Sequence, residues 1–191
     1  MRGGPQILLD HPYSLFNMRI DALTLDESVA ACTDLVEARV PAQHVVVNAS
    51  KVVLANSNPR LRKIINNAAL VNADGQSIVT IGRLAGIPLS ERVTGIDLMH
   101  ALLIKASDNG WPVFFLGAKR AVLDVAVRRI QQTNPDLVIA GIRHGYFLDD
   151  LPVAKQIKLS GARLLFIAMP SPKKEFWVDQ YASELGPCLS F

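Results

Sequence analysis

The 191-residue sequence has little cysteine, few aromatic residues and no long apolar run. The two cysteines, Cys32 and Cys188, lie far apart in apolar surroundings, which favours two buried free thiols. Their spacing is not that of a metal-binding motif. No run approaches the roughly 18 residues that a membrane-spanning helix needs. The stretch 1–17 also lacks the apolar centre of a signal peptide. We therefore expect a cytoplasmic protein whose contact with a membrane is peripheral.

Charge of one sign is not concentrated anywhere in the chain. The formal net charge is +3, and the lysines and arginines are scattered or occur in pairs, as at 128–129 and 173–174. These pairs can be solvated helix ends or can face phosphate or lipid. They are not interleaved with aromatic residues, so nucleic-acid binding is not supported. Half of the residues are apolar and the mean hydropathy is +0.24, which indicates strands buried on both faces.

Short β-branched runs alternate with segments of helical periodicity. Strands are predicted at 44–48, 70–73, 112–117, 137–141 and 163–169, with helices between them and short connections. Pro59 predicts a break in the helical segment 49–68, and Gly110 predicts the end of another helix. This alternation predicts an α/β fold in one domain over 18–191, with a mainly parallel sheet, helices on both faces and an N-terminal extension over 1–17. The last five residues begin a further strand with no helix after it, so we expect a C-terminal segment to be missing.

Polar residues and glycines follow most of these strands. In parallel α/β sheets ligands bind beyond the carboxyl ends of the strands. The residues found there are Asn48, the pair Asp74-Gly75, Gly117, the loop 141–147 and the segment 169–175. Their backbone N–H groups and helix N-termini would suit a pyrophosphate.

Two of these positions have both a structural and a functional interpretation. Asp74 can be part of an ordinary Asp-Gly turn, or it can be a general base at a strand end. Arg92 can form a surface ion pair with Glu91, or it can clamp a phosphate.

Several common catalytic motifs are absent. The sequence contains no GxxxxGK[ST] loop and no GxGxxG motif, so binding of ATP or of a nicotinamide cofactor is not favoured. It also contains no G-x-S-x-G motif of the serine hydrolases. The four histidines have no metal-ligand spacing. We expect His44 and His100 to be structural, while His144 can reach a substrate from its loop.

Four motifs in order carry a family resemblance. The segments "NADGQSIV…RLAGIPLSERVTGIDLMHALL", "PVFFLGAKRAVLDVAVRRI", "LVIAGIRHGYF" and "SPKKEFW" resemble the WecG/TagA/CpsF family of bacterial glycosyltransferases over roughly residues 18–191. The resemblance implies a Rossmann-like domain and inverting, metal-independent transfer without a cofactor. The donor would be a UDP-sugar of the N-acetylmannosamine, uronic acid or glucose type. The acceptor would be a polyprenyl-diphosphate-linked saccharide at the inner face of the cytoplasmic membrane, in cell-envelope or exopolysaccharide synthesis.

The resemblance also assigns roles to residues. It implies that Asp74 is the catalytic base, and the other positions that match family motifs would bind substrate: Asn48, Arg92, Gly117, Gly145, Tyr146, Phe147, Pro172, Lys173, Lys174 and Glu175. No metal ligand is implied, and the leaving UDP would be stabilised by cationic side chains and amide dipoles.

The sequence departs from the family pattern in three places. Val46 stands where many members have threonine, and Lys174 stands where many have glutamine. Members also usually continue into a basic C-terminal appendage implicated in membrane contact and closure over UDP. These departures keep a second interpretation open, a non-catalytic nucleotide-binding or scaffold relative of the same fold. An oligomer is also compatible with the apolar helix faces.

Overall fold

The computed structural model describes residues 13–191, which form a small hairpin and a six-stranded sheet. All pairs in the large sheet are parallel, and the strand order is β4-β3-β8-β7-β5-β6. The strands of this sheet are β3 (Ala42–Val47), β4 (Leu70–Ala73), β5 (Val113–Gly117), β6 (Ile139–Arg143), β7 (Leu164–Ala168) and β8 (Leu189–Ser190). The predicted α/β class with a mainly parallel sheet is confirmed.

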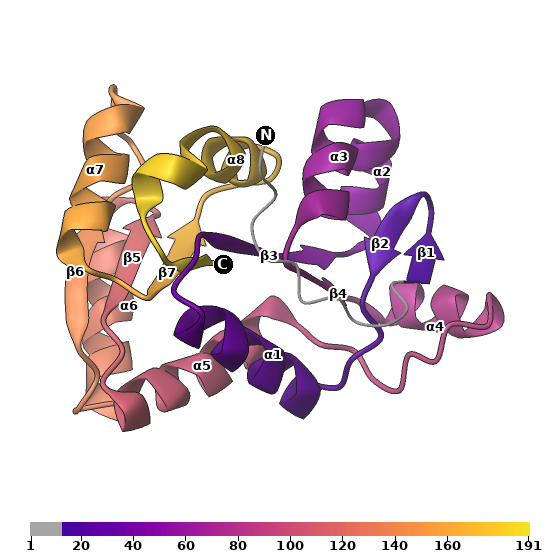
Figure 1. Ribbon diagram of the computed structural model, residues 1–191, viewed down its shortest axis with the longest axis horizontal. Helices are drawn as coiled ribbons and strands as arrows, with labels where there is room; N and C mark the ends of the chain where they lie inside the picture. Colours follow the sequence, from indigo (N-terminus) through magenta and orange to yellow (C-terminus); the bar gives the residue numbers. More distant parts are fainter. Residues whose placement is uncertain (1–12) are drawn as a thin grey trace.

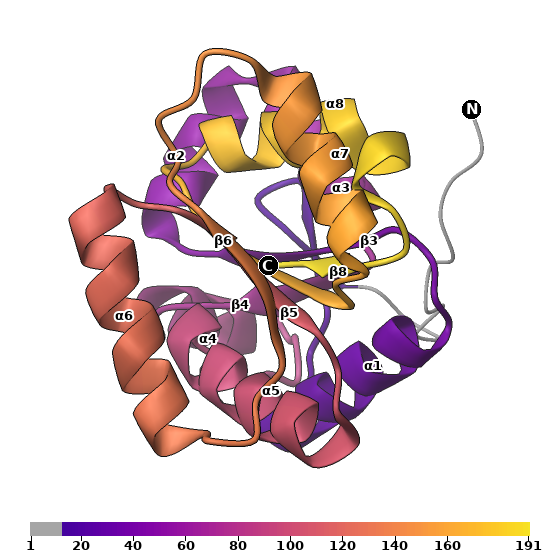
Figure 2. The ribbon, with the colours of Figure 1, turned by 90° about the vertical axis from the view of Figure 1, so that its left-hand side faces the viewer.

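Helices cover both faces of the sheet. Figures 1 and 2 show α2, α3, α7 and α8 on one face and α1, α5 and α6 on the other. The helices are α1 (Leu25–Glu37), α2 (Ala49–Ser57), α3 (Pro59–Asn67), α4 (Gln76–Leu84), α5 (Gly95–Asn109), α6 (Arg120–Thr133), α7 (Asp150–Ser160) and α8 (Lys173–Leu185). In the described part of the chain, no helix combines the length and the apolar character needed to cross a membrane.

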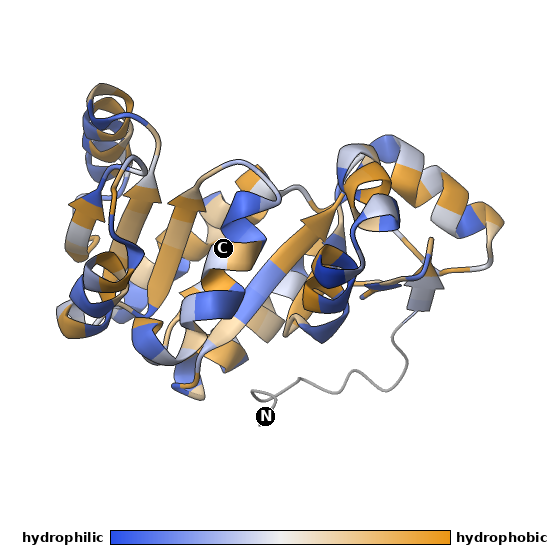
Figure 3. Ribbon diagram, turned by 90° about the horizontal axis from the view of Figure 1, so that it is seen from above, coloured by the Kyte–Doolittle hydropathy of each residue, from blue (hydrophilic) through white to orange (hydrophobic). Residues whose placement is uncertain are grey.

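The two-sided cover explains the apolar strands seen in the sequence. Every residue of β5 is buried, and its side chains alternate between two layers. Phe115 packs in the cluster with α1 and α5, whereas Phe114 and Leu116 pack in the cluster with α7 and α8. Figure 3 shows that apolar residues dominate the strands seen from above. The sheet is therefore a rigid platform whose carboxyl edge carries the loops.

Local signals in the sequence set several helix ends. Thr24 begins α1 with a capping box that Glu27 completes. Asn58 caps α3 and Pro59 is its first residue, so the predicted break between two helices is confirmed. Gly110 ends α5 in the left-handed conformation, as predicted.

A two-stranded hairpin joins the β4 side of the sheet. It consists of β1 (Tyr13–Leu15) and β2 (Met18–Ile20), and the expected extension over 1–17 otherwise lies outside the described residues. Arg19 Nε donates to Asp21 Oδ1 over 2.8 Å, and both side chains are buried. Asp21 Oδ2 also accepts from the backbone N–H of Val71 in β4 over 2.8 Å. This buried ion pair fixes the hairpin to the sheet.

Candidate active site

Asp74 stands at the carboxyl end of β4 in a fixed backbone position. Its N–H donates to the carbonyl of Val47, the last residue of β3, over 2.8 Å. The next residue, Gly75, has a φ of 112° and immediately precedes α4. Because that conformation favours glycine, the Asp-Gly pair turns the chain sharply from strand to helix. The turn leaves the carboxylate half-buried at the sheet edge.

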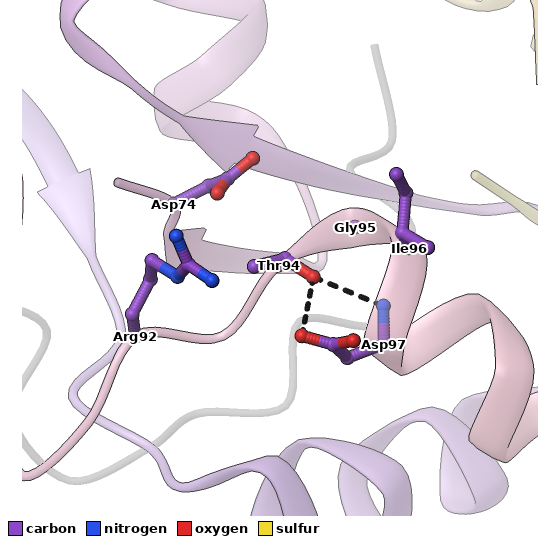
Figure 4. Close-up of a pocket in the computed structure, with 6 residues that line it drawn as sticks. All are labelled: Asp74, Arg92, Thr94, Gly95, Ile96 and Asp97. Atoms are coloured by element: carbon purple, nitrogen blue, oxygen red, sulfur yellow. Dashed lines mark hydrogen bonds between the residues drawn. The ribbon is translucent and has the colours of Figure 1, made fainter. Parts of the chain in front are cut away.

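The segment before α5 brings a second set of polar groups to Asp74. Val93 N–H donates to the carbonyl of Ala73 over 3.1 Å, so this segment lies against the end of β4. Figure 4 shows Arg92 reaching toward Asp74 from this segment. Thr94 caps α5, donating from Oγ1 to Asp97 Oδ2 over 2.6 Å and accepting from the Asp97 N–H over 3.0 Å.

These residues enclose an open pocket of about 480 Å³. The pocket is lined by Asp74, Arg92, Thr94, Gly95, Ile96 and Asp97. Such a volume is in the range of small-molecule sites. One carboxylate from a strand end and one guanidinium from a neighbouring segment therefore face a shared space.

The surroundings of Asp74 raise its pKa. Burial is the largest cause, and the charges of Arg92 and Lys51 oppose it, while Asp97 adds a smaller upward contribution. A carboxyl with a raised pKa is a stronger base when ionised, which is the property that proton abstraction requires. The two nearby cations keep the ionised form accessible.

One predicted site residue has a structural contact, and the expected ion-pair partner of another is bound elsewhere. Asn48 caps α2, because its Oδ1 accepts from the Lys51 N–H over 2.9 Å. Glu91 does not pair with Arg92 but accepts from the Leu25 N–H at the start of α1, over 2.5 Å. Arg92 is thus exposed beside the pocket, and the surface ion pair with Glu91 is not formed.

The predicted glycines lie at the other end of the sheet. Gly117 ends β5 with a φ of 116°, and a Cβ there would lie 2.5 Å from the carbonyl oxygen of Ala168 in β7. A Cβ on Gly145, in the loop after β6, would lie 3.0 Å from Gly117 Cα. Both glycines therefore allow three neighbouring loops to pack closely. This group lies apart from the Asp74 pocket because β3, β8 and β7 separate β4 from β5.

The aromatic residues of the same loop lie near the start of α8. Phe147 packs against Trp177, with ring centroids 6.1 Å apart, and Lys173 Nζ lies 5.9 Å from the Phe147 ring. Tyr146 is exposed. Pro172 immediately precedes α8. The structure thus brings Phe147 together with Lys173 but not with Asp74.

A charge cluster, in which Lys51 and Glu175 are buried and Ser171 and Lys174 are half-buried, lies between these two groups. We call it the buried charge cluster after its central ion pair. Lys51 comes from α2 after β3, Lys174 and Glu175 come from the first turn of α8, and Ser171 comes from the segment between β7 and α8. Lys51 Nζ donates to Glu175 Oε1 over 2.6 Å, and Ser171 Oγ donates to Glu175 Oε2 over 2.9 Å. Burial raises the pKa of Glu175, but the neighbouring cations, above all Lys51, outweigh it and hold the pKa below its usual value.

Lys174 has no such compensation. Within residues 13–191 its ammonium forms neither an ion pair nor a hydrogen bond. Burial, together with repulsion from Lys51, lowers its pKa to about 8, although the charge of Glu175 opposes the change. One uncompensated positive charge therefore remains at the centre of the carboxyl edge.

The three described histidines lie in different surroundings, one buried, one exposed on a helix and one in a loop. His44 is buried, its Nε2 lies 2.9 Å from Asn72 Oδ1, and burial lowers its pKa to about 3, so it is neutral and structural, as expected. His100 was expected to be structural too, but it is exposed on α5. His144 Nδ1 accepts from the Tyr146 N–H over 3.2 Å in its loop. In the part of the chain that the structure describes, no three histidine, cysteine or acidic residues are grouped so that they could hold a metal ion.

Sequence reasoning missed several residues of this edge. They are Lys51, Thr94, Gly95, Ile96, Asp97 and Ser171. Thr94 could have been found as the helix cap before an apolar periodic segment. Lys51 could have been noticed as a lone cation in the first turn of a helix after a predicted strand. Its pairing with Glu175 could not be predicted, because 124 residues separate the two.

Comparison with known proteins identifies the family. The family model for glycosyl transferases of the WecG/TagA/CpsF family matches residues 13–191. The chain belongs to the WecG/TagA/CpsF family. The predicted resemblance is therefore confirmed, and the match includes the pocket, the buried charge cluster and the β1–β2 hairpin.

Two relatives carry a specific name. A protein of Bacillus spizizenii is 35% identical over 127 residues, covering 66% of this chain and 49% of that protein. A Staphylococcus aureus protein is 36% identical over 141 residues, covering 73% of this chain and 55% of that protein. Both are named N-acetylglucosaminyldiphosphoundecaprenol N-acetyl-beta-D-mannosaminyltransferase. The chain spans about half the length of the curated relatives it matches.

Proposed function

We propose that this protein is an inverting, metal-independent glycosyltransferase in cell-envelope or exopolysaccharide synthesis. It transfers a hexose-type sugar from a UDP donor to a polyprenyl-diphosphate-linked saccharide. The observation that carries the proposal is the half-buried Asp74 carboxylate, held at a strand end in a pocket shared with Arg92. Family membership and the names of the two relatives support the reaction class and the type of acceptor.

Asp74 serves as the general base in this proposal. Its carboxylate removes the proton from an acceptor hydroxyl while that oxygen attacks the anomeric carbon of the donor sugar. The bond from the anomeric carbon to the UDP oxygen breaks, and the electron pair leaves with UDP. The attack comes from the face opposite the leaving group, so the configuration at the anomeric carbon inverts.

Positive charge must stabilise the diphosphate as it leaves. Arg92 is exposed beside Asp74 in the same pocket, and its planar guanidinium suits a phosphate. The start of α5 adds backbone N–H groups, which favour negative charge. The lipid diphosphate of the acceptor requires the pocket to work at a membrane surface, and we propose peripheral contact with the inner face of the cytoplasmic membrane.

A transfer assay tests the proposal. The protein is incubated with a set of UDP-hexoses and undecaprenyl-diphosphate-linked N-acetylglucosamine, with and without EDTA. We expect a disaccharide-lipid with an inverted anomeric centre and no effect of EDTA. Binding of UDP without turnover of any donor would favour the non-catalytic alternative, and retention of configuration would refute the proposed mechanism.

A further inference from the structure

The loop between β6 and α7 carries an inference about how the protein meets a membrane. Its exposed apolar side chains are Tyr146, Leu148 and Leu151, which we call the apolar tip. We propose that the apolar tip inserts into the surface of an anionic lipid bilayer, with Leu148 as the central contact. The inference rests on the proposed function, because it names the surface by which the enzyme approaches its lipid-linked acceptor.

The exposure of the apolar tip is the first argument. Its three large side chains lie within six residues of sequence, and Leu148 is the most exposed large apolar residue in the described part of the chain. Figure 2 shows the loop, in orange, along the top of the view. Single exposed apolar residues are normal on protein surfaces, whereas several together mark a contact surface. Leu148 and Leu151 are not among the positions that the resemblance assigns to substrate.

The inner side of the loop is the second argument, because it is held by the fold. The Gly145 N–H donates to the carbonyl of Ala118 over 3.0 Å. Phe147 is half-buried and packs against Trp177 of α8. The chain therefore alternates, with Phe147 turned toward the protein and its neighbour Leu148 in solvent. The exposure of Leu148 is thus a feature of a loop fixed by contacts on its other side.

The charges around the apolar tip suit an anionic surface. Lys119 follows the residue that accepts the hydrogen bond of the loop, and Lys173 Nζ lies 5.9 Å from the Phe147 ring. Both lysines are exposed, and neither forms an ion pair within residues 13–191. The nearby carboxylates have partners in the protein, since Asp149 caps α7 and Asp150 Oδ1 accepts from an indole N–H over 3.1 Å. Apolar side chains flanked by free lysines are typical of a surface that binds anionic lipid.

The position of the loop links it to the proposed reaction. All six strands of the sheet are parallel, so the loop after β6 and Asp74 after β4 lie on the same edge. Five strand spacings place the apolar tip roughly 24 Å from the Asp74 pocket along that edge. The diphosphate of a polyprenyl-linked acceptor lies at the bilayer surface. Insertion of the apolar tip therefore keeps the pocket close to the acceptor.

Vesicle flotation tests this surface. The vesicles contain equal parts of phosphatidylglycerol and phosphatidylethanolamine, and vesicles of phosphatidylcholine serve for comparison. The proteins are wild type, Leu148→Ser and Leu159→Ser. The last is the matched control, because Leu159 is an exposed leucine near the other end of α7. Circular dichroism checks that each variant is folded, and analytical ultracentrifugation measures its oligomeric state.

We expect wild type to bind the anionic vesicles more tightly than the neutral ones. Leu148→Ser should weaken that binding about tenfold, because serine removes one leucine side chain from the apolar phase. Leu159→Ser should bind as wild type does. Absence of wild-type binding to the anionic vesicles, or equal binding by wild type and Leu148→Ser, would overturn the proposal. A dimer that Leu148→Ser dissociates, with vesicle binding unchanged, would assign the apolar tip to a second copy and would also overturn it.

Failure of the proposed function gives a different pattern. Sugar transfer is measured with an undecaprenyl-linked acceptor in the anionic vesicles and with a water-soluble acceptor that carries a short prenyl chain. We expect Leu148→Ser to raise KM for the vesicle acceptor alone. An equal loss with both acceptors would place Leu148 in the site itself and would contradict the proposal. If wild type transfers sugar to neither acceptor, the proposed function is wrong, and flotation alone decides whether the apolar tip binds a bilayer.

Discussion

Replacement of Lys174 by glutamine should stabilise the ligand-free protein. The pKa of Lys174 is lowered from 10.5 to about 8 by burial and by Lys51. At about 1.4 kcal/mol per pKa unit, this difference corresponds to roughly 3 kcal/mol of destabilisation by the protonated lysine at pH 7. Glutamine removes the charge but keeps a polar group in place, so we expect a gain of about 1–3 kcal/mol in the free energy of unfolding.

The pH dependence separates this cause from a change in packing. Because the folded-state pKa lies below the unfolded value, the unfolded chain binds more protons between pH 8 and 10.5. The stability of wild type therefore gains a contribution from Lys174 as the pH rises through this window, and the glutamine variant lacks it. The advantage of the variant should be full below pH 8 and should vanish near pH 10.5.

Urea unfolding followed by circular dichroism at pH 7, 8.5 and 10 measures the difference between the two proteins. The exposed Lys63→Gln variant is the control and should stay within about 0.5 kcal/mol of wild type. A Lys174→Gln variant that is less stable than wild type, or whose advantage does not change with pH, would refute the reasoning.

Three further predictions concern buried groups. Glu175→Gln leaves Lys51 buried without its counter-ion, so urea unfolding should show a loss of about 3 kcal/mol or more. Gly117→Ala places a Cβ 2.5 Å from a backbone oxygen of β7 at a positive φ, and the same assay should show a loss of about 2–4 kcal/mol. Burial raises the pKa of Cys32 to about 12 and that of Cys188 to about 11, so a colorimetric thiol reagent at pH 8 should label neither until urea unfolds the chain. Rapid labelling of native protein, or unchanged stability in either variant, would contradict these expectations.

Local patterns in the sequence were sufficient for most of the architecture. The run 112–117 is apolar on both sides because helices cover both faces of β5, and this made a parallel sheet predictable. The break at Pro59 and the end at Gly110 follow from the chemistry of single residues. Asp74 was found as a candidate because it is a carboxylate directly after a strand.

The strand order could not be found in this way. β8, the last strand in the chain, lies between β3 and β7, and its two residues carry no signal of their neighbours. The strand order also decides which loops meet. It places Gly117 and Gly145 at a different part of the carboxyl edge from the Asp74 pocket.

The charge cluster also depends on contacts between residues that are far apart in the sequence, and such contacts could not be predicted. Lys51 and Glu175 form an ion pair of 2.6 Å across 124 residues of sequence, and neither residue alone indicates its partner. Lys174 stood out in the sequence as a departure from a family motif and as a position that the resemblance assigns to substrate binding. Its missing counter-ion became visible once the starts of α2 and α8 were placed together.

The most direct test of the account is the turnover of Asp74→Asn in the sugar-transfer assay, measured together with its affinity for UDP. Asparagine keeps the shape of the side chain but cannot accept a proton. We predict that kcat falls by at least about 10²-fold while UDP affinity stays within about twofold of wild type. The control, Asp108→Asn, changes an exposed carboxylate near the end of α5 and should retain full activity. Wild-type turnover by Asp74→Asn would show that Asp74 is not the base and would contradict the central claim.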